Sequence, residues 1–260
     1  KYNIKHDGDL ILDFSRIHMS LDKGRAFGIN PKLSGTKTKT VDRILNADIY
    51  KKKEVRDNFN ELTLKFKGNY RIVFRAYNEG IAYRFESDIK GDIIVENELS
   101  EFNFLHDAKA YIPYVRDNVA TLESQFGNPF ENIYKYENIS QWDTSRIAFL
   151  PLLVEGRNGK KLCILEADLL NYPGMYLYNG DGSNTLKSVF APYPKEVEQG
   201  GYLNLQGLVK SREPYIAKVS GVTSFPWRIM VVSENDKELA DNDMVFKLAT
   251  RPQGDFSWVK

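Results

Sequence analysis

Alternation of apolar and polar residues is the feature that most restricts the fold of this chain. It runs through residues 60–66, 70–77 and 80–86, where apolar side chains recur at nearly every second position. A period of two is typical of antiparallel strands with one buried and one solvated face. No window keeps a helical stripe of apolar residues beyond about two turns, and helices shorter than roughly 12 residues are marginal by themselves. The pattern therefore predicts an all-β protein.

Turn signals between the apolar segments predict hairpins. Residues 78–80 connect two of the alternating segments, and the pair Asn158–Gly159, which favours a type I′ turn, separates segments 146–154 and 161–165. Strands joined by turns favour a large antiparallel β-sandwich over parallel α/β units. Further strands are expected at residues 10–12, 92–96, 109–114, 186–190, 215–219, 227–232 and 245–248.

Charge and cysteine content argue against several classes of function. The 36 lysines and arginines nearly balance the 35 acids, so the net charge of +1 provides no field to attract nucleic acid or an anionic membrane. No segment approaches the roughly 20 apolar residues of a membrane span. Cys163 is the one cysteine, which excludes an internal disulfide, and its place in an apolar segment predicts a core role. The chain begins at Lys1, which suggests that a leader, if one existed, has been removed.

Two carboxylates follow the apolar segment 161–165. The two-residue period of extended chain predicts that Glu166 and Asp168 share one face, before residues 171–174 form a turn in which Pro fixes φ and Gly permits positive φ. Such a pair suits a hard cation or a sugar. The alternative is that both are ordinary solvated acids at the end of a strand, and spacing alone leaves both interpretations open.

Other candidate groups give weaker signals. Trp227 and Arg228 open an apolar strand, which predicts that the tryptophan packs in the core and the arginine orders a nearby carboxylate or loop. Tyr172 offers a flat face that suits either a sugar ring or core packing. The histidines have neither zinc spacing nor a neighbouring nucleophile, and no pair of acids is marked for glycosidic chemistry; they are His6, His18 and His106.

Four segments, taken together and in order, resemble the amino-terminal domain of glycoside hydrolase family 97: residues 75–85, 165–177, 225–228 and 256–260. That family includes α-glucosidases and α-galactosidases from Bacteroidetes-type bacteria. The resemblance covers nearly the whole chain, and the stretch from Glu166-Ala-Asp to Tyr-Pro-Gly is its most specific part. It implies a large β-sandwich similar to galactose mutarotase, a super-sandwich forming one domain over residues 1–260. A catalytic (β/α)₈ barrel is expected downstream and absent from this chain, which by itself is expected to be inactive and to contain no catalytic residue.

The resemblance also implies a shared calcium site. The family binds calcium near the substrate, largely through barrel glutamates and with one glutamate from the amino-terminal domain, whose motif position Glu166 matches. Ca²⁺ takes six to eight oxygen ligands, so this chain alone is expected to bind it weakly or not at all. The parent enzyme is expected in the periplasm or at the outer membrane. The rim of the oligosaccharide site shared with the barrel is expected to include Asp168, Asn171, Tyr172, Trp227 and Arg228.

A second interpretation is a free-standing carbohydrate-binding or mutarotase-like β-sandwich protein. An aldose epimerase normally gathers histidines and an acid in the groove of the sandwich, and the scattered histidines of this chain weaken that interpretation. A binding module predicts sugar affinity from this chain alone, whereas an accessory domain predicts little or none.

Overall fold

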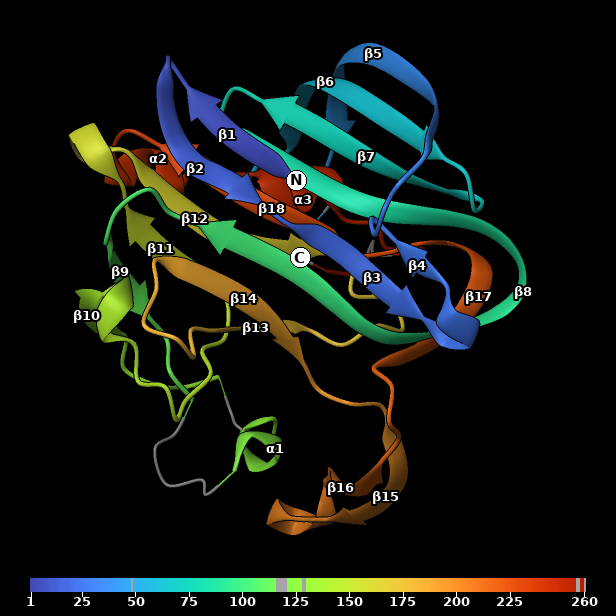
Figure 1. The fold of residues 1–260 in the computed structure, drawn as a ribbon. Coiled ribbons are helices and arrows are strands. Elements are labelled where there is room, and N and C mark those ends of the chain that lie inside the picture. The colour runs from blue at the N-terminus through green and yellow to red at the C-terminus, as the bar shows by residue number, and fades with distance from the viewer. Residues whose placement is uncertain (48, 116–120, 128–129, 256–257, 260) are drawn as a thin grey trace.

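Strands dominate the computed structural model, which describes residues 1–47, 49–115, 121–127, 130–255 and 258–259. Part of the predicted motif 256–260 therefore lies outside the described residues: Phe256, Ser257 and Lys260. Sixteen strands of the described part connect through hydrogen bonds into one sheet that folds into layers, and two more form a separate hairpin (Figure 1). The predicted all-β sandwich is thereby confirmed.

One layer is a row of antiparallel strands. In spatial order it contains β10 (Lys135–Asn138), β9 (Lys109–Ile112), β11 (Leu152–Glu155), β12 (Lys161–Ala167), β18 (Trp227–Ser233), β8 (Gly80–Asn103), β7 (Tyr70–Tyr77), β6 (Glu54–Phe66) and β5 (Leu33–Asn46).

The other strands of the sheet attach to β8 or to its neighbours. They are β1 (Tyr2–His6), β2 (Asp9–Ser15), β3 (Ile17–Leu21), β4 (Ala26–Phe27), β13 (Met175–Tyr178), β14 (Thr185–Phe190) and β17 (Ala217–Ser224). The separate hairpin consists of β15 (Pro194–Gly200) and β16 (Gln206–Arg212). The described helices are α1 (Leu122–Gln125), α2 (Asp236–Ala240) and α3 (Met244–Leu248), with 3₁₀ turns at Asp22–Gly24, Ile139–Gln141, Arg157–Gly159 and Tyr202–Asn204.

Strand β8 links the two layers. Its first residues pair with β7 and β18, its middle pairs with β17, and its last residues pair with β2, β3 and β14. A bend in this long strand coincides with Gly91 at φ +79°, opposite a register shift at Gly221 in β17. A Cβ on Gly221 would lie 2.2 Å from the Gly91 carbonyl oxygen, so only glycine fits there.

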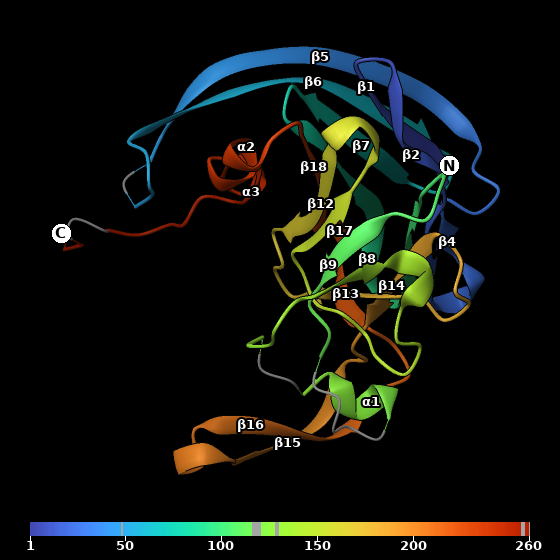
Figure 2. The ribbon, with the colours of Figure 1, turned by 90° about the vertical axis from the view of Figure 1, so that its left-hand side faces the viewer.

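Apolar side chains fill both faces of the central row. The main core lies between the layers, where Tyr83, Phe85 and Ile164 of the row meet Leu12 and Phe102. The opposite face of the row is covered by α2 and α3 (Figure 2). A second cluster forms there, and it includes Trp227, Ile229, Val231, Met244 and Leu248. Burial on both faces makes β18 apolar along nearly its whole length.

Both predicted hairpins are confirmed. β7 and β8 pair from Tyr77 opposite Gly80 onwards. Between β11 and β12, Asn158 and Gly159 have φ of 56° and 76°, and the Lys160 N–H donates to the Arg157 carbonyl oxygen at 3.1 Å, as a type I′ turn requires.

The predicted strand at residues 245–248 is wrong, because this segment lies in helix α3. Met244 and Leu248, one helical turn apart, are both buried against the sheet. The Met244 N–H donates to the Asn242 side-chain oxygen at 2.9 Å, which satisfies a donor at the start of the helix. None of the described helices combines the length and apolar character that crossing a membrane requires.

Candidate functional site

A buried ion-pair cluster joins three strands of the central row. Arg228 of β18 is 1% exposed, and it lies beside Glu98 of β8 and opposite Glu166 of β12 in the strand register. Its guanidinium donates to both oxygens of Glu98 at 2.8 Å and, through Nη1, to Oε2 of Glu166 at 2.6 Å. Two carboxylates thus share one guanidinium, and the three groups carry a net charge of −1 when both acids are ionised.

Hydroxyl groups complete the contacts of Glu98. The Tyr172 hydroxyl donates to Oε2 at 2.8 Å, and the Ser100 hydroxyl donates to Oε1 at 3.2 Å. The Tyr83 hydroxyl in turn donates to Ser100 at 2.9 Å. Both oxygens of Glu98 are therefore engaged, which offsets the cost of burying the charge. Glu98 orders Arg228, and Arg228 holds Glu166 in place.

Glu98 was missed by the sequence analysis. In the run from Asn97 to Glu101, simple alternation around Leu99 places the leucine inward and its polar neighbours, Glu98 and Ser100, outward. The structure reverses this, since Glu98 and Ser100 are buried and Leu99 is only half-buried. The sequence did contain a signal for a buried acid. Arg228 stands at the start of an apolar strand, and a buried guanidinium requires an acidic partner.

Glu166 is the more exposed acid of the cluster. Its side chain is 12% exposed, and besides Arg228 it accepts the Met175 N–H at 3.0 Å on each carboxylate oxygen. Burial raises the pKa of Glu166 to about 7, although the charge of Arg228 opposes the shift. Gly174 lies against this carboxylate, and a Cβ there would be 3.3 Å from Oε1. Gly174 is not at positive φ, so its role is close approach and not the turn geometry predicted.

Asp168 does not share a face with Glu166, which corrects the prediction. The strand ends at Ala167, and Asp168 has φ +68°, so the two-residue alternation stops before it. Its oxygens accept the N–H of Thr250 at 2.8 Å and the hydroxyl of Thr250 at 3.0 Å. The Arg84 guanidinium is 3.8 Å away. Asp168 therefore anchors the segment that follows α3.

The predicted rim residues occupy two different environments. Trp227 is 1% exposed, and the guanidinium groups of Arg75 and Arg84 lie 4.7 and 4.3 Å from its ring centroid. Arg228 is engaged as described above. The packing role predicted for the tryptophan and the ordering role predicted for the arginine are both observed. Their place at a substrate rim remains a prediction, as it does for Asp168.

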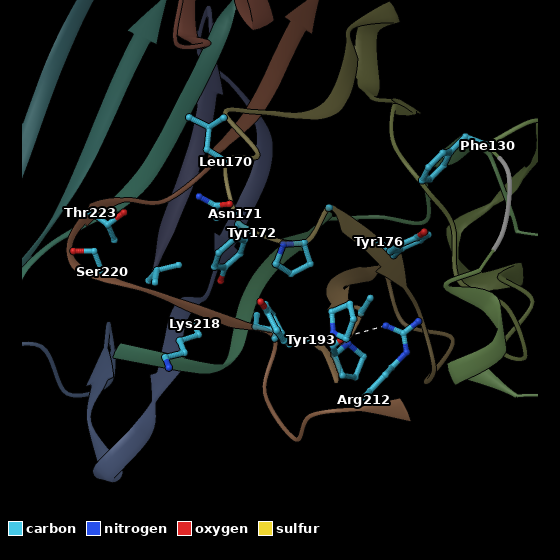
Figure 3. A pocket seen from close by; sticks show the side chains of 17 residues that line it. Phe130, Leu170, Asn171, Tyr172, Tyr176, Tyr193, Arg212, Lys218, Ser220 and Thr223 are labelled. Atoms are coloured by element: carbon cyan, nitrogen blue, oxygen red, sulfur yellow. Dashed lines mark hydrogen bonds between the residues drawn. The ribbon is translucent and has the colours of Figure 1, made fainter. Parts of the chain in front are cut away.

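Asn171 and Tyr172 lie in the wall of a pocket of about 600 Å³ (Figure 3). Asn171 has φ +55°, and the 171–174 turn forms one side. Figure 3 shows Tyr193 and Arg212 across from this turn, with Ser220 and Thr223 beside it. Gly174 belongs to the same wall, so the pocket is adjacent to the Glu166 carboxylate. The volume falls within the range of small-molecule sites.

Another group of metal-ligating side chains lies elsewhere. In the described part of the chain, His6, Asp7 and Glu234 bring three ligand atoms within 4.8 Å of one another, and Glu166 belongs to no such group. Lys160 lies beside that group, with Nζ 3.8 Å from Glu234, and supplies a positive charge. Cys163 is not poised as a nucleophile, because burial raises its pKa to about 12.

Comparison with known proteins gives consistent results. Residues 1–251 match the family model described as the glycosyl hydrolase 97 N-terminal domain. A retaining α-galactosidase of Bacteroides thetaiotaomicron is 46% identical over 261 residues, which cover all of this chain and 39% of that protein. A family 97 glycoside hydrolase from Pseudoalteromonas sp. strain K8, solved with acarbose, has the same fold at a TM-score of 0.78 and 20% identity, over all of this chain and 36% of that one. The chain thus spans well under half the length of these relatives, and it belongs to the N-terminal domain family of glycoside hydrolase family 97.

Proposed function

We propose that this chain is the non-catalytic N-terminal domain of a calcium-dependent, exo-acting α-glycoside hydrolase. It packs on a catalytic (β/α)₈ barrel that follows it, lends Glu166 to a calcium ion and forms part of the rim of the oligosaccharide site. The relatives extend far beyond the matched region, which supports a further domain after residue 260. We place the enzyme in the periplasm or at the outer membrane.

The proposal rests on the contacts, exposure and charge of the Glu166 carboxylate. It is held by Arg228 and by the Met175 N–H, yet its side chain is 12% exposed, and the cluster carries a net negative charge once Glu166 ionises, above its pKa of about 7. Carboxylate oxygen is a hard ligand of the type Ca²⁺ prefers, and six to eight such ligands are needed. Glu98 cannot supply them, because its oxygens are already engaged. The remaining ligands therefore come from the barrel and from water.

Each neighbour of Glu166 has a positioning role in this arrangement. Glu98 fixes Arg228, Arg228 sets the orientation of the Glu166 carboxylate, and Gly174 leaves room beside it. Calcium, when bound, would supply positive charge that orients the sugar and stabilises charge developing in the reaction. The acids that cleave the bond belong to the barrel in this proposal. Similarity to a retaining α-galactosidase favours α-galactosides as the substrate class.

Calcium titration of the full-length enzyme tests the assignment. We expect Glu166→Gln to raise the calcium concentration needed for hydrolysis of an aryl α-galactoside by about tenfold or more, because the charge of the ligands sets calcium affinity. Asp168→Asn is the matched control, since it also removes one carboxylate charge, two residues from Glu166, but from a side chain that binds Thr250. Unchanged calcium dependence in Glu166→Gln would refute the role of Glu166.

Hydrolysis assays on the 260-residue chain test whether the catalytic acids lie outside it. We expect no hydrolysis of aryl α-galactosides or α-glucosides with millimolar calcium, and turnover that depends on one of its own acids would overturn the proposal.

The pocket beside Asn171 and Tyr193 favours the free-standing sugar-binding protein as a second candidate. Calorimetric titration with oligosaccharides separates the two, because a binding module predicts measurable affinity from this chain alone.

A further inference from the structure

The β15–β16 hairpin stands apart from the rest of the fold. Among the described residues, its two strands pair only with each other, and the hairpin extends away from the sandwich (Figure 1). All residues of β15 up to Gln199 are exposed, as are the first five residues of β16. An isolated two-stranded hairpin is marginally stable in water, so this one requires additional contacts to hold its shape.

The tip of the hairpin carries large apolar side chains. Tyr202, Leu203 and Leu205 are 77%, 72% and 76% exposed. Val197 in β15 adds a further exposed apolar side chain, at 58%. Exposed apolar side chains grouped in one short turn mark an interaction site more often than single scattered residues do.

Backbone geometry at the tip supports the same conclusion. Leu203 has φ +53° and Asn204 has φ +58°. Asparagine tolerates this region, but leucine pays roughly 1–2 kcal/mol there because its Cβ approaches the following carbonyl oxygen. A leucine that is both strained and 72% exposed suits a binding surface, where its side chain would be buried by a partner.

The side on which the hairpin lies identifies its partner. In Figure 2 the hairpin, the connection between β5 and β6, and the C-terminal segment that follows α3 all project to the same side of the sandwich. The matching family describes an N-terminal domain, and the rest of each relative is longer than the matched part. The domain that follows is therefore joined on the side towards which the hairpin points.

We propose that the β15–β16 hairpin is an arm whose apolar tip, formed by Tyr202, Leu203 and Leu205, docks on the domain that follows in the same polypeptide. This inference rests on the proposed function only in requiring that such a domain exists. The base of the arm also forms part of the pocket, because Pro194 and Arg212 line it. Docking of the tip therefore fixes one wall of the pocket against the adjoining domain.

Arg212 links the arm to its surroundings at the base. Its Nη1 donates to the Pro192 carbonyl oxygen at 2.8 Å, and its Nε lies 2.6 Å from the carboxylate of Glu123 in α1. The base is thus held by polar contacts within this domain, while the apolar side chains at the tip, Tyr202, Leu203 and Leu205, are each more than 70% exposed among the described residues. The division predicts a rigid base and a tip that becomes ordered through the partner domain.

Hydrogen exchange in the full-length protein tests the arm. We expect amides of residues 197–209 to be protected in the wild type, and Leu203→Ser with Leu205→Ser to raise their exchange rates by about tenfold or more as local opening replaces docking. Amides of β12 and β18 serve as the internal reference and keep their rates. The matched control is Phe14→Ser with Leu105→Ser, which removes two exposed apolar side chains, 58% and 51% exposed, elsewhere on the molecule.

Two results would overturn the inference. One is rapid exchange of the hairpin in the wild type, unchanged by the double substitution. The other is protection that appears only when light scattering shows a dimer, which would assign the tip to a second copy of the chain. Neither readout depends on calcium or turnover, so failure of the arm is distinguishable from failure of the Glu166 assignment.

Discussion

Arg228 and Glu98 form a bidentate ion pair inside the sandwich, in which the Nε–Oε1 and Nη2–Oε2 distances are both 2.8 Å. The side chains are 1% and 3% exposed, so water does not screen the pair. Glu166 accepts a hydrogen bond from Nη1 of the same guanidinium. The position of Glu166 is therefore set, through Arg228, by Glu98, which is itself too buried to bind a ligand.

Removal of the buried acid is expected to destabilise the protein strongly. Glu98→Ala removes the bidentate partner of Arg228, and loss of one member of a buried ion pair typically lowers the free energy of unfolding by about 3–5 kcal/mol. Urea unfolding monitored by tryptophan fluorescence measures the change. Glu198→Ala is the control, since its pair with Lys210 is more than half exposed and is expected to contribute less than about 1 kcal/mol. Equal effects of the two substitutions would contradict the structural role of Glu98.

Gly174→Ala tests the close approach to Glu166. The added Cβ lies 3.3 Å from Oε1 and must displace either the carboxylate or the turn, at a cost of about 1 kcal/mol. We expect a lower free energy of unfolding and, in the full-length enzyme, a higher calcium requirement. Gly35→Ala in β5 is the control, because a Cβ there meets nothing within 4 Å. A calcium requirement equal to that of the control would show that the Glu166 carboxylate does not depend on this space.

Asp168→Ala separates anchoring from calcium binding. It removes both hydrogen bonds to Thr250, so we expect a loss of about 1–3 kcal/mol in the free energy of unfolding. The calcium requirement of the full-length enzyme is expected to stay unchanged, in contrast to that of Glu166→Gln. Thr250→Val removes only the hydroxyl donor and should give a smaller loss of the same kind. A calcium effect in Asp168→Ala would assign this acid to the metal site instead.

Acid sensitivity is expected from the pair of Arg16 and Glu101. Burial acts to raise the pKa of Glu101, but hydrogen bonds from the Arg16 guanidinium and N–H outweigh it, so the pKa lies below its usual value. A carboxyl with a lowered pKa in the folded state stabilises the protein above its unfolded pKa, near 4.5. That stabilisation is lost as the pH falls through the folded pKa.

The comparison of wild type with Glu101→Gln measures this contribution. The difference in the free energy of unfolding between the two proteins should be constant above about pH 5 and shrink towards acid pH. A difference that grows as the pH falls would contradict the assignment.

Local sequence was sufficient wherever short-range chemistry decides the structure. Alternation identified the β7–β8 hairpin, and Asn158–Gly159 identified the turn between β11 and β12, because a period of two and a preference for positive φ are properties of a few adjacent residues. The packing of Trp227 was also predicted from its position in an apolar strand. The strand prediction for residues 245–248 failed because the three apolar residues of this short segment suit a strand or a helix equally.

Tertiary structure alone decided the site. The sequence determined that this chain forms a β-sandwich, and it singled out Glu166 through a motif. It did not show that Glu98, 68 residues earlier, sets the position of that acid through Arg228, or that Asp168 turns away to bind Thr250. Hydrogen bonding between side chains depends on which strands become neighbours and on where an extended strand ends. Both are settled by burial of the whole sheet and not by any local pattern.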